Sequence, residues 1–195
     1  MLGLVDSKKV VIVGIPGVGK TSLVTKLVEL ITQQSKTVSV HSFGTVMLEE
    51  AMKNGIKDRD ELRTLPIEKQ QELQKMAAED ISNMEDDVIL IDTHAFISTK
   101  SGFYPGLPNY VIQIIKPTNF IAITASPDEI HNRRMKDTTR NRDPVSIEDI
   151  KKELAVQDAM LSSCSVLSGS PMKVVFNHEG KVEEAAKSVL GAIGL

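Results

Sequence analysis

Eight residues near the amino terminus combine glycines, one lysine and one hydroxyl in an order suited to binding phosphate. They read Gly14-Ile15-Pro16-Gly17-Val18-Gly19-Lys20-Thr21, which fits the pattern G-x-x-x-x-G-K-[ST]. Glycines let backbone amides curl around phosphate oxygens, Lys20 can reach the terminal phosphates, and the Thr21 hydroxyl can bind Mg²⁺. The pattern therefore predicts a phosphate-binding loop (P-loop).

A carboxylate stands where such a loop needs a metal-binding partner. Asp92 directly follows the apolar run Val88-Ile89-Leu90-Ile91. A carboxylate at that place can hold Mg²⁺ directly or through water, whereas the plainer alternative is an aspartate that caps a turn. The P-loop favours the metal-binding interpretation. His94 could equally hydrogen-bond a phosphate or a neighbouring loop.

Two groups of arginines could neutralise phosphate charge. Arg59 and Arg63 are four residues apart, hence on one helix face, although alone this pattern favours a solvated face. Four more arginines flank the polar loop that ends at Pro144; they are Arg133, Arg134, Arg140 and Arg142. Arginines on a loop can close over a triphosphate, and the alternative is a solvated turn.

Composition excludes several classes of protein. The 195 residues carry 23 basic and 26 acidic side chains, a balance that argues against a nucleic-acid-coating protein. The sequence has no apolar run of about 18 residues, and its first apolar residues are too few for a signal peptide, so we expect no membrane span and a cytoplasmic protein. Cys164 is the one cysteine, which excludes an internal disulfide.

Strand-like and helical patterns alternate along the chain. Short buried strands are predicted at 10–13, 38–43, 88–91, 120–124 and 173–176, and amphipathic helices follow residue 20 and cover 73–84, 147–161 and 182–193. This order predicts an α/β fold, a three-layer αβα domain over 1–195 with a five-stranded parallel sheet. Residues 44–84 are predicted to form a helical insertion, and 136–144 a short lid loop.

The acceptor chemistry narrows the choice among P-loop proteins. Asn177-His178-Glu179-Gly180 does not match the base-reading motif N-K-x-D of GTPase switches. A phosphate acceptor is largely ionised at pH 7, so it needs cations rather than a catalytic base. Arg59 and Arg63 meet that need, which favours a nucleoside monophosphate over a sugar or shikimate.

The motifs together resemble the archaeal-type adenylate kinases over nearly the whole chain. Besides the P-loop, the motifs in family order are Phe43-Gly44-Thr45, Asp58-Arg59-Asp60-Glu61-Leu62-Arg63, Asp92-Thr93-His94, Gly106-Leu107-Pro108 and Thr139-Arg140-Asn141-Arg142-Asp143. The resemblance implies reversible phosphoryl transfer from Mg-ATP to AMP giving two ADP, an AMP-binding insertion, and a homotrimer.

The resemblance also implies a role for each motif residue. The ATP phosphates would lie along Gly14 to Ser22, with Mg²⁺ held by Thr21 and Asp92 and catalysis by Lys20, Arg134, Arg140 and Arg142. AMP would be bound by Gly44, Thr45, Arg59, Arg63, Gly106 and Pro108. The adenine of ATP would rest against the backbone around Asn177 to Gly180.

The sequence departs from the bacterial and eukaryotic adenylate kinases at two places, and the first leaves the second contact to the AMP phosphate unassigned. Asn109 stands where bacterial and eukaryotic adenylate kinases carry an arginine, and the lid has no zinc-binding cysteines. The alternatives are a cytidylate- or shikimate-type kinase, or a nucleotide-dependent regulatory or assembly factor.

Overall fold

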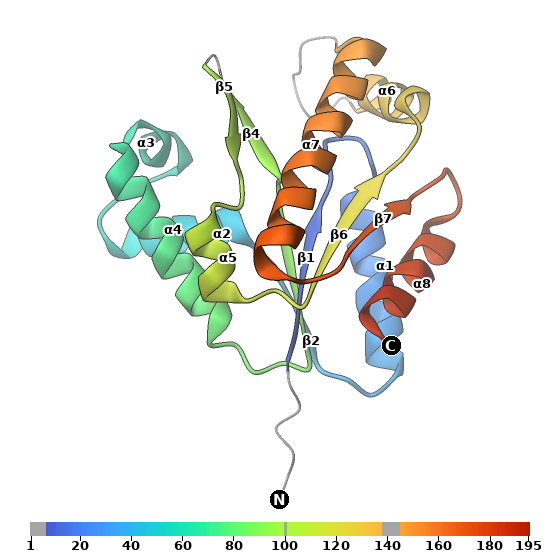
Figure 1. Cartoon of the computed structure of the whole chain (residues 1–195), viewed down its shortest axis with the longest axis horizontal. Coiled ribbons are helices and arrows are strands. Elements are labelled where there is room, and N and C mark those ends of the chain that lie inside the picture. Colours follow the sequence, from blue (N-terminus) through green and yellow to red (C-terminus); the bar gives the residue numbers. More distant parts are fainter. Residues whose placement is uncertain (1–6, 100, 138–144) are drawn as a thin grey trace, which may run out of the picture.

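A five-stranded parallel sheet lies at the centre of the protein, in the order β2-β3-β1-β6-β7 (Figure 1). The computed structural model describes residues 7–99, 101–137 and 145–195, and the backbone alone at Arg63. The sheet is built of β1 (Lys8–Val13), β2 (Val38–Ser42), β3 (Val88–Thr93), β6 (Asn119–Thr124) and β7 (Met172–Phe176). Each corresponds to a predicted strand.

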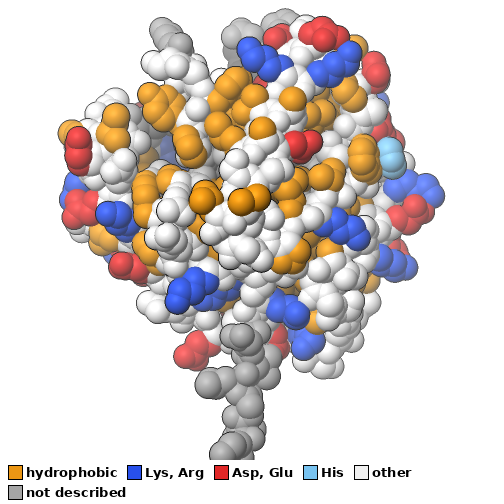
Figure 2. Space-filling model, in the orientation of Figure 1, with side chains coloured by type: hydrophobic (Ala, Val, Ile, Leu, Met, Phe, Trp, Pro, Cys, Tyr) orange, Lys and Arg blue, Asp and Glu red, His pale blue; other side chains and the backbone are white. Residues whose placement is uncertain are grey.

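Helices cover both faces of this sheet, as the three-layer prediction required. Val10 and Ile12 of β1 pack in one apolar cluster with α1 (Lys20–Gln33) and α8 (Val182–Ile193). Val11 and Val13 pack in a second cluster on the opposite face, because successive side chains of a strand alternate. On the molecular surface seen in the orientation of Figure 1, hydrophobic side chains are spread across the middle, and more of the charged side chains lie toward the edges (Figure 2).

The predicted helical insertion consists of three helices between β2 and β3. They are α2 (Phe43–Lys53), α3 (Arg59–Thr64) and α4 (Ile67–Ser82). The strand before them ends one residue earlier than the pattern indicates, because Phe43 is the first residue of α2, where its side chain is buried. Asp58 caps α3 by accepting hydrogen bonds from the amides of Asp60 and Glu61, both at 2.9 Å.

An antiparallel hairpin that the sequence patterns did not predict follows β3. It pairs β4 (Phe96–Thr99) with β5 (Gly102–Pro105), and the short helix α5 (Asn109–Ile115) comes next. The rings of Phe96 and Phe103 meet edge to face at 5.1 Å, and the Lys152 ammonium lies 5.7 Å from the Phe103 ring centre. The hairpin is thereby attached to α7 (Ile147–Ser168), the helix that carries Lys152.

Two helices flank the predicted lid, and both start in the same way. In α6 (Pro127–Lys136) and in α7, a serine and an acidic residue three positions later form a reciprocal capping box. Arg133 and Arg134, predicted to flank the loop, lie within α6, and α6 also includes Lys136, the first residue of the predicted lid. Residues 138–144 of the lid, with Arg140 and Arg142, lie outside the described residues.

Candidate active site

The P-loop joins the carboxyl end of β1 to the amino end of α1, as predicted. Gly17 and Gly19 have positive φ values of 91° and 81°, and Gly19 caps α1. A side chain at either position would be strained, and a Cβ atom on Gly19 would lie 2.5 Å from the Asn177 amide nitrogen. The first turn of α1 has no acidic residue that would repel an anion from the positive amino end of the helix.

Side chains from two other segments hold the carbonyl groups of this loop. Arg134 Nε donates to the Pro16 carbonyl at 2.8 Å, and Arg133 Nη1 donates to the Val18 carbonyl at 3.3 Å. Asn177, which is 5% exposed, donates through Nδ2 to Val18 at 2.9 Å. These contacts hold the P-loop carbonyl oxygens on the side of the loop that faces α6 and Asn177. The N–H groups of the loop can then point to the opposite side, where phosphate binds.

Lys20 and Asp92 are brought together at the end of β3. Lys20 Nζ lies 2.5 Å from Asp92 Oδ1 and donates to the Thr93 carbonyl at 2.7 Å. Lys20 is thus the cation that balances the charge of Asp92 in the structure. The parallel register puts Asp92 beside Ile12, one strand away from the P-loop.

The same two elements supply ligands of the kind that a divalent metal prefers. The Asp92 carboxylate and the exposed Thr21 hydroxyl are hard oxygen donors, which fit Mg²⁺. Among the described residues there is no group of three or more His, Cys, Asp or Glu that could hold a metal. That is compatible with Mg²⁺, which is commonly held by one or two carboxylates, waters and substrate phosphates.

Two of the predicted acceptor residues meet at the insertion. Arg59 Nη2 donates to the Thr45 hydroxyl at 3.0 Å, which joins the start of α3 to the first turn of α2. Gly44 precedes Thr45, is exposed, and has open space where a side chain would stand. The side chain of Arg63 lies outside what the structure describes.

Gly106 and Pro108 lie where the hairpin returns to the end of β3. The Gly106 amide donates to the Ala95 carbonyl at 2.9 Å, and a Cβ on Gly106 would lie 1.9 Å from the His94 carbonyl oxygen. No other residue fits at this position without moving the backbone. Pro108 precedes α5 as its amino-terminal cap residue.

The segment after β7 is fixed to the start of α6 through one carboxylate. Glu129 accepts hydrogen bonds from the backbone amides of Glu179 and Ser126, both at 3.0 Å, and contacts the His178 ring. These amides hold the pKa of Glu129 down at about 2, since they stabilise the charged form. His178 also stacks on Phe176 with ring centres 5.7 Å apart.

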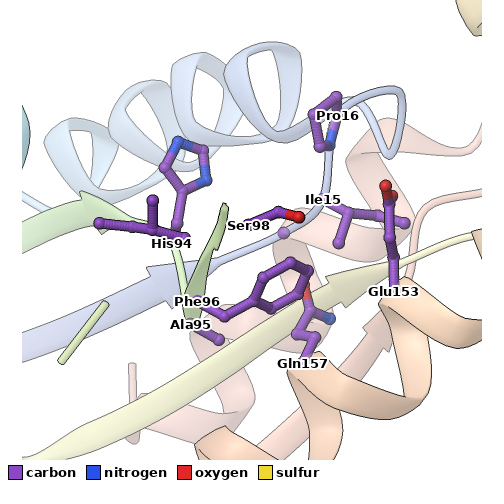
Figure 3. A pocket seen from close by; sticks show the side chains of 10 residues that line it. Ile15, Pro16, His94, Ala95, Phe96, Ser98, Glu153 and Gln157 are labelled. Atoms are coloured by element: carbon purple, nitrogen blue, oxygen red, sulfur yellow. The ribbon is translucent and has the colours of Figure 1, made fainter. Parts of the chain in front are cut away.

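An open cleft of about 270 Å³ adjoins the first half of the P-loop (Figure 3). Its walls are Gly14 to Pro16, His94 to Ser98, and two residues of α7, Glu153 and Gln157. Arg134 pairs with Glu153 at 2.6 Å, and its side chain is only 10% exposed. The predicted catalytic residue Arg134 thus contacts the P-loop backbone and an acid rather than open space.

For three residues that the structure places here, sequence reasoning missed the contact that they make. Arg133 was named only with the lid arginines, Asn177 only for its backbone, and Gln157 not at all. A capping-box signature, Ser126-Pro127-Asp128-Glu129, could have placed Arg133 on a helix.

No helix of the described residues is long and apolar enough to cross a membrane.

Comparisons with known proteins agree with this geometry. A family model described as an AAA domain matches residues 13–151. The adenylate kinase of Methanocaldococcus jannaschii is 37% identical over 186 residues, covering 94% of this chain and 97% of the relative. The adenylate kinase of Sulfurisphaera tokodaii is 40% identical over 191 residues, covering 94% and 97%.

Solved structures with this fold share little sequence with the chain. A shikimate kinase from Bacteroides thetaiotaomicron superposes with a TM-score of 0.58 at 12% identity, covering 96% of this chain and 99% of that chain. A second shikimate kinase, from Acinetobacter baumannii, gives a TM-score of 0.52 at 12% identity, covering 96% and 94%. At such identity the likeness concerns the fold alone.

Proposed function

The chain belongs to the adenylate kinase family, and on that premise we propose that it transfers the γ-phosphoryl group of ATP reversibly to AMP, giving two ADP. The observation that carries the proposal is the match to adenylate kinases over nearly their whole length. The P-loop with its anchored carbonyls and the Lys20–Asp92 pair supports phosphoryl transfer independently.

We propose that Gly14 to Ser22 hold the ATP phosphates and that Lys20 changes partners when they bind. Lys20 is paired with Asp92 in the structure, and a triphosphate offers it a stronger anion. Asp92 would then be free to hold Mg²⁺. Mg²⁺, held by Thr21 and Asp92, would neutralise charge on the phosphates.

The acceptor site is proposed at the insertion and the hairpin base. Thr45 and Arg59 already contact each other there, and Arg63 lies one helical turn further along α3. On the family resemblance, Gly44, Gly106 and Pro108 would border the AMP nucleoside, and the open space at Gly44 is compatible with that role. Arg140 and Arg142 stay proposed as lid residues that reach the transferring group.

An acceptor panel tests the function directly. ADP formation from Mg-ATP is followed with AMP, CMP, UMP, GMP or shikimate as the acceptor. We expect turnover that depends on AMP and on a divalent metal. Preference for CMP or shikimate would assign a different kinase, and slow hydrolysis indifferent to every acceptor would assign a nucleotide-dependent regulatory factor.

Two further properties belong to the same proposal. The cytoplasm is the proposed location, because the sequence has no apolar run of about 18 residues, and a homotrimer is the proposed assembly on family resemblance. Light scattering of the purified protein distinguishes a trimer from the 21.4 kDa monomer.

A further inference from the structure

Gln157 is a buried polar side chain that faces the cleft beside the P-loop. Its side chain comes from α7 and lies beneath Phe96, on the same side of the helix as Glu153 (Figure 3). Gln157 is 1% exposed, and its Nε2 has no hydrogen-bond partner among the described residues. An unsatisfied buried amide destabilises a fold, so this donor needs an explanation.

The surroundings of Gln157 on α7 are apolar, which makes the amide more unusual. Ile150, Leu161 and Cys164 are buried on the same helix at helical spacing from it. The carboxyl group of its chain neighbour Asp158 interacts with the Gln157 side chain, although no acceptor among the described residues meets hydrogen-bond geometry at Nε2. That contact only partly offsets the burial that raises the pKa of Asp158. An apolar residue would therefore serve packing better than glutamine does.

The charges around the cleft leave room for an anion. Glu153 is the acid at the cleft wall, and Arg134 neutralises it at 2.6 Å. The cleft opens onto Gly14 to Pro16, the half of the P-loop that precedes the phosphate-cradling amides. An acceptor that attacks the γ-phosphate in line has to approach through the space in front of this loop.

We propose that Gln157 is a substrate-binding residue whose Nε2 donates a hydrogen bond to a phosphate oxygen where the two nucleotides meet. The inference rests on the proposed function. A neutral donor adds direction without another charge in a mainly apolar wall, and Lys20 and the arginines supply the cations. The oxygen belongs to the AMP phosphate or to the γ-phosphate of ATP, and the experiment separates these sources.

The test compares the wild-type chain with Gln157→Met, which keeps the volume and removes the amide. Calorimetry gives Kd for AMP alone and for ATP alone, so no turnover occurs, and thermal unfolding gives Tm. Gln33→Met is the matched control, because Gln33 is exposed at the far end of α1. Gln157→Leu is measured in parallel in case the methionine variant folds poorly.

We expect Kd for AMP to rise on the order of tenfold in Gln157→Met, as for the loss of a hydrogen bond to a charged group. Tm should stay equal or rise, because an unsatisfied donor is gone. A rise confined to ATP would also support the contact and assign it to the γ-phosphate. Unchanged Kd values for both nucleotides, with or without a lower Tm, overturn the inference and leave Gln157 a structural residue.

The proposed function can fail separately from this inference. A wild-type chain that binds and phosphorylates AMP, together with a Gln157→Met variant that binds both nucleotides normally, overturns the Gln157 contact alone. A wild-type chain that neither binds nor phosphorylates AMP overturns the proposed function, and the acceptor contact with it.

Discussion

Lys20 contacts two groups at the end of β3, and neither contact belongs to the apolar core. Lys20→Ala removes a cation proposed to act on the transferring group, so we expect kcat/KM to fall by about 10²–10³-fold. The fold should be retained, because the lost partners are a partly exposed carboxylate and a carbonyl. Steady-state kinetics with circular dichroism test this, and near-native activity in a folded variant would contradict the assignment.

Arg59 is the acceptor-site arginine whose side chain the structure places. Arg59→Ala removes the contact to Thr45 and a proposed charge-assisted bond to the AMP phosphate. We expect Kd for AMP to rise about tenfold or more and Kd for ATP to stay unchanged. Lys57→Ala, an exposed cation two residues earlier, is the calorimetric control. Unchanged AMP affinity in Arg59→Ala would return Arg59 to a solvated face and direct the test to Arg63.

At the scale of elements, Glu129 connects α6 to the segment between β7 and α8. Its pKa of about 2 lies below the ordinary value of 4.5, so the charged form stabilises the fold fully above pH 4.5. This contribution is lost as pH falls from 4.5 toward 2. Because the side chain is 24% exposed, solvent screening reduces the contribution, and we take about 1–3 kcal/mol.

Denaturant unfolding of wild type and Glu129→Gln should therefore differ most above pH 4.5. The difference in unfolding free energy should shrink as the pH approaches 2. Lys181→Gln is the control, because Lys181 forms an exposed ion pair with Glu184, three residues further along the chain. A difference that does not change across this pH window would mean that the hydrogen bonds to Glu129 do not require its charge.

The strands of the sheet could be predicted because β1, β3, β6 and β7 each contain a short apolar run, and β2 opens with apolar and polar residues in alternation. The hairpin escaped prediction because its strands are brief and largely exposed, although Ser101-Gly102 between aromatic residues is a turn signal. The hydrogen bonds from Arg133 and Asn177 to the P-loop carbonyls could not be predicted from the sequence. Asn177 lies 159 positions from Val18, and only the crossover of the chain brings them together.

At the scale of the whole molecule, the lid is the part of the proposal that depends on movement. Its sequence between Asp137 and Asp143 has no apolar residue to hold it closed, so closure should follow ATP binding. Replacing both Arg140 and Arg142 by alanine should lower kcat more than it raises KM for ATP, because their charge acts mainly in the transition state.

The size of the fall in kcat shows whether the lid arginines act in the transition state or only in ATP binding. Arginines in comparable positions contribute on the order of 10³–10⁵ in rate, and a pair on a short loop is expected at or below the lower end. Full kinetic curves in both substrates measure it. A variant with normal kcat and a higher KM for ATP would show that the arginines provide uniform binding instead.

The anchored carbonyls of the P-loop have a kinetic consequence. The loop is held by hydrogen bonds from Arg133, Arg134 and Asn177, and these do not depend on nucleotide. Its amides are therefore already oriented for phosphate before ATP binds. Association then requires no ordering of the loop. The on-rate for ATP should be governed by encounter and charge, and therefore fall with ionic strength, while slower steps in the cycle arise elsewhere in the molecule.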